Sequence, residues 1–98
     1  GTPSYMSPEQ VLGKEADPRS DVYSLGLVMY ECLTGQTVFR GDNVLERQLQ
    51  EMPPPPSQVS QDVPAVLDGI VMRCIAKKPD ERYAAMRELY DALKAVAL

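Results

Sequence analysis

The chain of 98 residues contains no histidine, no tryptophan, a single phenylalanine and only two cysteines. Cys32 and Cys74 lie far apart in the sequence, and neither belongs to a C-x-x-C pair. Without histidine or clustered thiols, the sequence predicts no metal site. Both cysteines are therefore interpreted as reduced core thiols, and a cytoplasmic location is expected because thiols stay reduced in that compartment.

Positive charge is also scarce. Ten Lys and Arg residues stand against fourteen Asp and Glu residues, the formal net charge is −4, and the basic residues form no run. A nucleic-acid-binding surface needs a basic stripe, and an anionic membrane attracts polybasic clusters. The most apolar stretch, residues 22–33, is too short to cross a bilayer and contains polar residues. We therefore expect no nucleic-acid partner and no membrane segment in this chain.

Helical periodicity accounts for most of the remaining sequence, of which 44% is hydrophobic. Apolar residues recur at helical spacing, and no segment has a convincing strand pattern. The sequence therefore predicts an all-α unit of about five helices around one buried central helix. The expected spans are residues 7–13, 21–34, 43–52, 64–77 and 84–96.

Capping residues mark the expected helix starts, where backbone N–H groups lack partners within the helix. Ser7 precedes Pro8 and lies three residues before Gln10, which is a capping-box pattern. Ser20 is expected to cap the second helix. Asn43 is expected to open a capping box for the third helix, which is polar on most faces and should lie on the surface.

The second helix is expected to be buried on nearly all sides, because apolar residues occupy most of its faces. Its apolar residues are Val22, Leu25, Leu27, Val28, Met29, Cys32 and Leu33. The last two helices each have a predicted core face. Those faces comprise Val66, Leu67, Ile70, Val71, Cys74 and Ile75 in one helix, and Met86, Leu89, Leu93 and Val96 in the other.

Four consecutive prolines, Pro53–Pro56, interrupt the helical pattern. Proline has no N–H group and favours an extended conformation, so this run predicts a connector without hydrogen bonds. An SH3-type ligand is the functional alternative. Because helices are predicted close to both ends, a stiff spacer within the domain is favoured.

Three motifs occur in a characteristic order. Residues 1–9 read G-T-P-S-Y-M-S-P-E, residues 21–26 read D-V-Y-S-L-G, and residues 77–83 read K-K-P-D-E-R-Y. Together they resemble the end of the activation segment, the start of the large central helix and the end of a Ser/Thr protein kinase domain. The D-V-Y and E-R-Y variants resemble bacterial, eukaryotic-like Ser/Thr kinases. Residues 1–98 are thus expected to form part of a kinase domain, within its helical C-terminal lobe.

The resemblance implies that the first residues bind substrate. The implied substrate-binding residues are Gly1, Thr2, Pro3, Ser4 and Tyr5. In the family, the threonine matched by Thr2 bonds the catalytic-loop Asp and Lys and helps to align the substrate hydroxyl. The loop matched by residues 3–6 contacts the substrate residue that follows the phosphoacceptor. Without the motif, Thr2 would be interpreted as an ordinary loop threonine.

The resemblance also implies structural support for the catalytic loop. Glu9 and Arg82 match a glutamate and an arginine that form an ion pair in the family, and Asp21 matches an aspartate that accepts backbone N–H bonds from the catalytic loop. Without the resemblance, Glu9 and Arg82 would be two solvated side chains. Asp21 would be an acid favoured by the dipole in the first helical turn; both interpretations of Asp21 can hold together.

Phosphoryl transfer also needs a Gly-rich loop, a phosphate-orienting Lys, a catalytic Asp and Asn, and the D-F-G Asp. None of these motifs occurs in the chain. We therefore expect no catalytic residue, no metal ligand and no cofactor site here, with ATP and Mg²⁺ bound elsewhere in the parent kinase. The parent would transfer the ATP γ-phosphate to protein Ser or Thr hydroxyls. This segment would supply substrate docking and scaffold, and would be inactive alone.

Two other interpretations remain open. A kinase remnant or pseudokinase piece would act as a non-catalytic helical interaction module. An unrelated helical domain would require three chance matches in the correct order. The expected partners under the kinase interpretation are a protein substrate and the remainder of the kinase domain. A cooperative melt of the isolated chain without exposed apolar surface would favour the interaction module.

Overall fold

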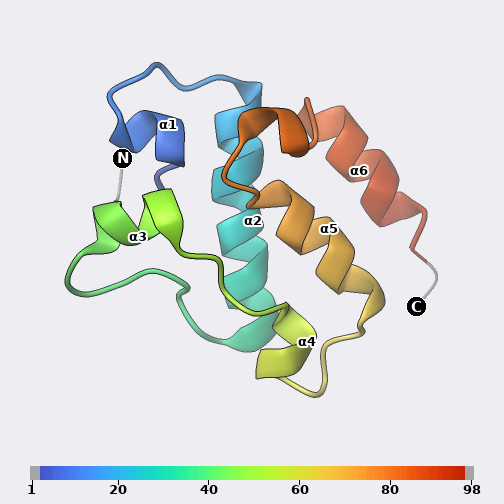
Figure 1. The fold of residues 1–98 in the computed structure, drawn as a ribbon. Helices are drawn as coiled ribbons and strands as arrows, with labels where there is room; N and C mark the ends of the chain where they lie inside the picture. Colours follow the sequence, from blue (N-terminus) through green and yellow to red (C-terminus); the bar gives the residue numbers. More distant parts are fainter. Residues whose placement is uncertain (1–2, 97–98) are drawn as a thin grey trace.

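The computed structural model describes residues 3–96, which form six α-helices and two short 3₁₀ helices without any strand. The elements are η1 (Pro3–Tyr5), α1 (Pro8–Val11), α2 (Pro18–Thr34), α3 (Val44–Gln50), α4 (Pro56–Val59), α5 (Val66–Cys74), η2 (Pro79–Glu81) and α6 (Met86–Lys94). Helix α2 runs through the middle, with α1 and α3 on one side and α5 and α6 on the other (Figure 1). The predicted all-α class is confirmed, with α4 as an additional helix. None of the described helices is long and apolar enough to cross a membrane.

Two of the predicted caps differ in the structure. The capping box of Ser7 and Gln10 is present as predicted. Helix α2, however, is capped by Asp17, whose side chain accepts from the Ser20 backbone N–H while the Ser20 hydroxyl bonds back to the Asp17 N–H. Ser20 thus completes the box instead of opening it, and the helix starts three residues earlier than predicted. Asn43 precedes α3 with φ of 62° and no side-chain cap bond.

The proline run is only partly a connector. Pro56 begins α4, where its fixed φ suits the first position of a helix. The run also accepts hydrogen bonds: the Tyr30 hydroxyl donates to the Pro54 carbonyl at 2.6 Å, and the Gln58 N–H donates to the Pro55 carbonyl at 2.9 Å. The predicted connector without hydrogen bonds is therefore wrong, because proline carbonyls remain acceptors. Pro56 is buried, which agrees with a spacer inside the domain.

The core lies on one side of α2. Its buried residues are Val22, Tyr23, Leu27, Tyr30, Phe39, Val71, Cys74, Ile75, Tyr83 and Leu89. Several residues predicted to point inward are exposed instead, namely Leu25, Val28, Cys32, Val66, Met86 and Leu93. Helix α2 is therefore not buried on all sides, and only one of the two cysteines is a core thiol. Five of the exposed residues line two adjoining apolar grooves along α2, α5 and α6.

The capping box of α2, which Asp17 opens and Ser20 completes, should contribute to the stability of the domain. Replacing Asp17 by Ala should lower the free energy of unfolding by about 1 kcal/mol, because the Ser20 N–H loses the Asp17 carboxylate and keeps only the Asp17 carbonyl as an acceptor. Urea unfolding of the kinase domain that contains this chain measures the change. Asp62 is an exposed acid outside any helix, and Asp62→Ala serves as the control. An equal effect of both substitutions would contradict the assignment of the cap.

Candidate substrate-docking site and its support

The loop Pro3–Met6, named the docking loop after its predicted role, lies between α2 and α3. Gly1 and Thr2, two of the predicted substrate-binding residues, lie outside the described residues. Helix η1 covers Pro3–Tyr5, and Met6 donates its N–H to the Pro3 carbonyl at 3.3 Å. Pro3 is exposed, whereas Ser4 and Tyr5 are half-buried. The loop therefore presents one side to solvent while the protein holds the other.

Tyr5 is bound to α2 through both its side chain and its backbone. Its hydroxyl donates to the Glu31 carboxylate at 2.5 Å, and the Thr37 hydroxyl donates to the other carboxylate oxygen at 2.7 Å. These two hydrogen bonds lower the pKa of Glu31. The Ser24 hydroxyl donates to the Tyr5 carbonyl at 2.6 Å. Sequence reasoning missed Glu31, although a single acid within the apolar stretch of residues 22–33 was a usable signal.

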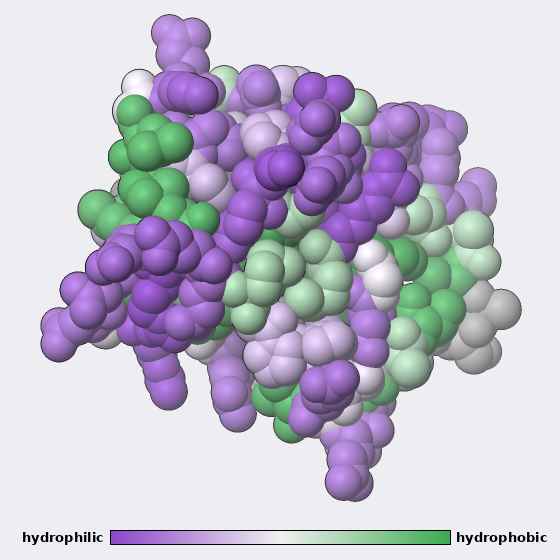
Figure 2. All heavy atoms as spheres, in the orientation of Figure 1, coloured by the Kyte–Doolittle hydropathy of each residue, from purple (hydrophilic) through white to green (hydrophobic). Residues whose placement is uncertain are grey.

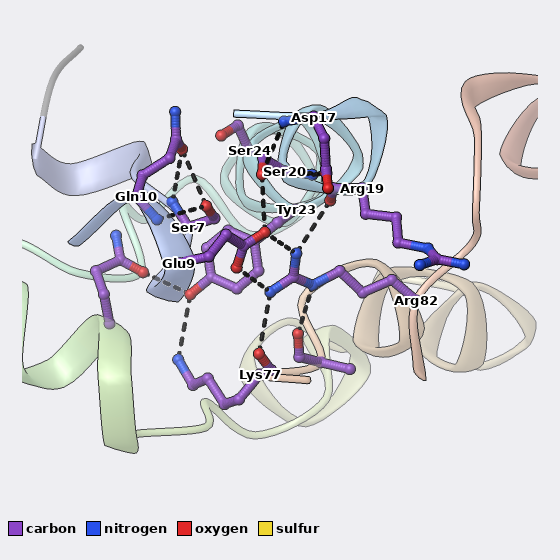
Figure 3. A network of polar contacts seen from close by, with 12 residues as sticks. Ser7, Glu9, Gln10, Asp17, Arg19, Ser20, Tyr23, Ser24, Lys77 and Arg82 are labelled. Carbon is purple, nitrogen blue, oxygen red and sulfur yellow. Dashed lines mark hydrogen bonds and ion pairs between the residues drawn. The ribbon is translucent and has the colours of Figure 1, made fainter. Parts of the chain in front are cut away.

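Glu9 and Arg82 form a bidentate ion pair although 73 positions separate them in the sequence. Two guanidinium nitrogens of Arg82 donate to the two Glu9 carboxylate oxygens at 2.6 and 2.9 Å. The Arg82 side chain is fully buried, and the Glu9 side chain is 10% exposed. The Ser20 hydroxyl also donates to Glu9 at 2.8 Å. The structure thus brings together the pair that the sequence motifs predicted (Figure 3).

The remaining donors of Arg82 also have partners. They bind the carbonyl oxygens of Arg19, Ala76 and Lys77 at 3.1, 2.7 and 3.1 Å. One guanidinium therefore links α1, the start of α2 and the segment after α5, as Figure 3 shows for Arg82 and Glu9. A buried charge is tolerated when all of its donors are paired in this way.

The electrostatics of Glu9 follow from these contacts. Burial by itself raises the pKa of Glu9, but the hydrogen bonds from Arg82, the backbone and Ser20 outweigh burial and lower the pKa to about 2. Glu9 is therefore ionised throughout the neutral range. A permanently charged, fully bonded pair is suited to holding elements together and not to transferring protons.

Asp21 lies apart from this pair. It occupies the first turn of α2, and its side chain is exposed. Among residues 3–96 its carboxylate accepts no hydrogen bond from a side chain, so the structure does not connect it to Glu9 or Arg82. Its predicted role toward a catalytic loop stays a prediction.

A second buried polar cluster, which sequence reasoning missed, joins α3 to the docking loop. Gln48 is fully buried and donates from its amide nitrogen to the Pro3 carbonyl at 3.1 Å. The Tyr23 hydroxyl donates to the Gln48 amide oxygen at 2.5 Å, and the Lys77 ammonium donates to the Tyr23 oxygen at 3.2 Å. A glutamine within a polar surface helix carries no sequence signal of burial, so only the tertiary structure reveals this cluster.

Comparison with known proteins assigns the family. Residues 1–92 match the protein kinase domain family. The chain belongs to this family. It is 48% identical over 92 residues to the serine/threonine-protein kinase PknB of Mycolicibacterium smegmatis, an alignment that covers 91% of this chain and 15% of the relative. Its identity to Pkn1 of Myxococcus xanthus is 41% over 97 residues, covering 96% of this chain and 14% of that kinase.

Solved structures agree with this assignment. The kinase domain of Mycobacterium tuberculosis PknI superimposes with a TM-score of 0.75 at 31% identity, over 96% of this chain and 35% of that chain. The predicted relationship to bacterial Ser/Thr kinases is therefore confirmed, and the chain corresponds to part of a kinase domain. The chain spans about 15% of the length of the curated kinases that it matches.

Proposed function

We propose that the protein containing this chain is a Ser/Thr protein kinase that transfers the ATP γ-phosphate to Ser or Thr hydroxyls of protein substrates. Residues 1–98 would form part of its kinase domain. The single observation that carries this proposal is the buried Glu9–Arg82 pair directly after the docking loop. It joins the predicted activation-segment motif to the motif at the end of the domain, which is the tertiary contact that the kinase resemblance requires.

The docking loop is proposed to position the substrate. Its exposed side is free to contact a peptide, while hydrogen bonds hold Tyr5 to α2. Gly1 and Thr2 would contribute to the same substrate-binding segment. Asp21 would reach toward the catalytic loop, which agrees with its exposed position on α2. Catalysis of phosphoryl transfer depends mainly on positioning, so such support is a substantial contribution.

ATP and Mg²⁺ belong to the proposed activity, but residues 3–96 contain none of the nucleotide-binding motifs of the family. Residues 3–96 contain no group of three or more Asp, Glu, Cys or His side chains that could hold a metal ion. None of these residues is therefore assigned to the nucleotide or to magnesium. We propose that other parts of the kinase domain bind both, and that the isolated chain transfers no phosphate.

The remainder of the kinase domain is the proposed partner of the apolar grooves. The larger groove is lined entirely by apolar side chains, namely Leu25, Val28, Met29, Cys32, Leu33, Leu67, Val71 and Leu93. In the orientation of Figure 2, hydrophilic side chains cover much of the molecule and hydrophobic atoms form separate patches.

The proposed location of the protein is the cytoplasm. Both cysteines are free, and Cys32 is exposed, which agrees with a reducing compartment.

A phosphate-transfer assay tests the proposed function. The kinase domain that contains this chain should incorporate labelled phosphate from ATP into peptides with Ser or Thr as phosphoacceptor, and into Tyr peptides far less. The isolated 98 residues should give only background incorporation. An intact domain that binds peptide without transferring phosphate would instead support the interaction module, whereas transfer by the isolated chain would contradict its proposed scaffold role.

A further inference from the structure

Gln48 is unusual among the polar residues of α3 because none of its side chain is exposed. Its neighbours Arg47 and Gln50 are half-buried and exposed, respectively. A buried amide is costly unless its donors and acceptor are paired. The partners of Gln48 come from two other elements, the docking loop and α2. The side chain of Gln48 therefore bridges three elements that are distant in the sequence.

Lys77 sets the direction of the two hydrogen bonds that join it to Tyr23 and Tyr23 to Gln48. Burial lowers the pKa of Lys77 to about 8, which leaves the amine mostly protonated at neutral pH. An ammonium group can only donate, so the Tyr23 oxygen accepts from Lys77 at 3.2 Å. The Tyr23 proton is then free to point toward the Gln48 oxygen, which lies 2.5 Å away.

The orientation of the Gln48 amide follows in turn. With its oxygen bound to the Tyr23 hydroxyl, the amide nitrogen faces the docking loop and donates to the Pro3 carbonyl at 3.1 Å. Burial raises the pKa of Tyr23, so this hydroxyl keeps its proton. The reverse amide orientation would place an N–H₂ group against the Tyr23 proton and an oxygen against a carbonyl. The contacts of Gln48 therefore place an N–H donor, and not an acceptor, opposite the Pro3 carbonyl.

The docking loop is anchored by different helices at Pro3 and at Tyr5. Tyr5 is held by Ser24 and Glu31 of α2, whereas the Pro3 carbonyl is held by Gln48 of α3. We propose that Gln48 is a positioning residue that holds the N-terminal end of the docking loop against α3 and thereby sets the affinity for the peptide substrate. This inference rests on the proposed function, since it assigns the loop to the substrate.

Two substitutions of Gln48 separate its donor from its bulk. Gln48→Glu keeps an acceptor for Tyr23 but cannot donate to Pro3, and Gln48→Met retains a similar volume without either bond. Gln50→Met is the matched control, because Gln50 is an exposed glutamine of the same helix. Each variant is made in the kinase domain that contains this chain. The readouts are kcat, the KM values for peptide and ATP, the melting temperature, and backbone amide exchange of Met6, whose N–H donates to the Pro3 carbonyl.

Both Gln48 variants should raise the peptide KM by about fivefold or more and leave the ATP KM within about twofold, while amide exchange in the docking loop accelerates. Gln50→Met should change none of these values. Gln48→Met decides the outcome if the buried carboxylate of Gln48→Glu prevents folding.

Folded Gln48 variants with an unchanged peptide KM and unchanged exchange would overturn the inference. A lower melting temperature with an unchanged peptide KM would mean that Gln48 is only a packing residue, and would overturn it as well. Absence of phosphate transfer by the unsubstituted domain would contradict the proposed function. In that case the exchange measurement still decides whether Gln48 holds the loop, so the two failures are distinguishable.

Discussion

Replacing Arg82 by Met should destabilise the kinase domain by roughly 3–5 kcal/mol, because the substitution leaves the Glu9 carboxylate buried without its cation. Three backbone carbonyls would lose their donors at the same time. Met replaces only the aliphatic part of the Arg82 side chain, so a loss of buried volume adds to the loss of charge and hydrogen bonds. Thermal and urea unfolding of the domain measure the effect, and a decrease below about 1 kcal/mol would contradict a buried pair.

A surface pair on α6 provides the matched control. Arg87 lies 3.2 Å from Asp91, but both side chains are largely exposed, at 80% and 59%. Arg87→Met should change the unfolding midpoint little, because solvent screens such pairs and salt weakens them further. A large effect of Arg87→Met together with a small effect of Arg82→Met would contradict the assignment of the Glu9–Arg82 pair as the one that stabilises the fold.

The same pair predicts a dependence of stability on pH. Glu9 has a pKa of about 2 in the folded chain, below its ordinary value of 4.5. Between these two pH values the folded state therefore binds fewer protons than the unfolded state. The stabilisation by Glu9 is complete above about pH 4.5 and is lost as the pH falls toward about 2. Glu9→Gln should remove this part of the acid dependence, which urea unfolding between pH 5 and 3 can measure.

Gly26→Ala should destabilise the domain by about 1–3 kcal/mol although alanine is the better helix former. Gly26 lies in the middle of α2 and faces α5. A Cβ at this position would lie 2.5 Å from the Cys74 Cβ and 2.8 Å from the Ile75 Cγ2. The contact with Cys74 involves an atom fixed to the backbone of α5, so the two helices would have to separate. Urea unfolding measures the loss.

The same substitution at Gly69 should have the opposite effect on the free energy of unfolding. It lies within α5, and a Cβ built there meets no atom within 4 Å. Gly69→Ala should therefore stabilise the domain by about 0.5–1 kcal/mol, since alanine loses less backbone entropy in a helix. In a Cys74→Gly background, which lacks the closest overlap, Gly26→Ala should cost less than it does in the unsubstituted domain. If Gly26→Ala were also stabilising, the close approach of α2 and α5 would be wrong.

Local sequence determined the features that depend on neighbouring residues. The capping box of Ser7 and Gln10 formed as predicted because a helix start needs acceptors within three residues. The cap of α2 was misassigned by three residues because Asp17 and Ser20 are both capping residues, and only their reciprocal bonds distinguish the two registers. The motif order was sufficient to predict the family and to pair Glu9 with Arg82.

Tertiary packing decided which side of each helix is buried. Helix α2 is apolar on most faces, so its sequence could not distinguish the buried Leu27 from the exposed Leu25 and Val28. The burial of Gln48 was equally invisible, because it depends on the docking loop and Tyr23 arriving at the same place. The sequence by itself determined the helical class and, through the family resemblance of its motifs, the family and the Glu9–Arg82 pair. Only the three-dimensional packing decided the buried side of α2 and the second anchor of the docking loop, because both require contacts between distant residues that no motif marks.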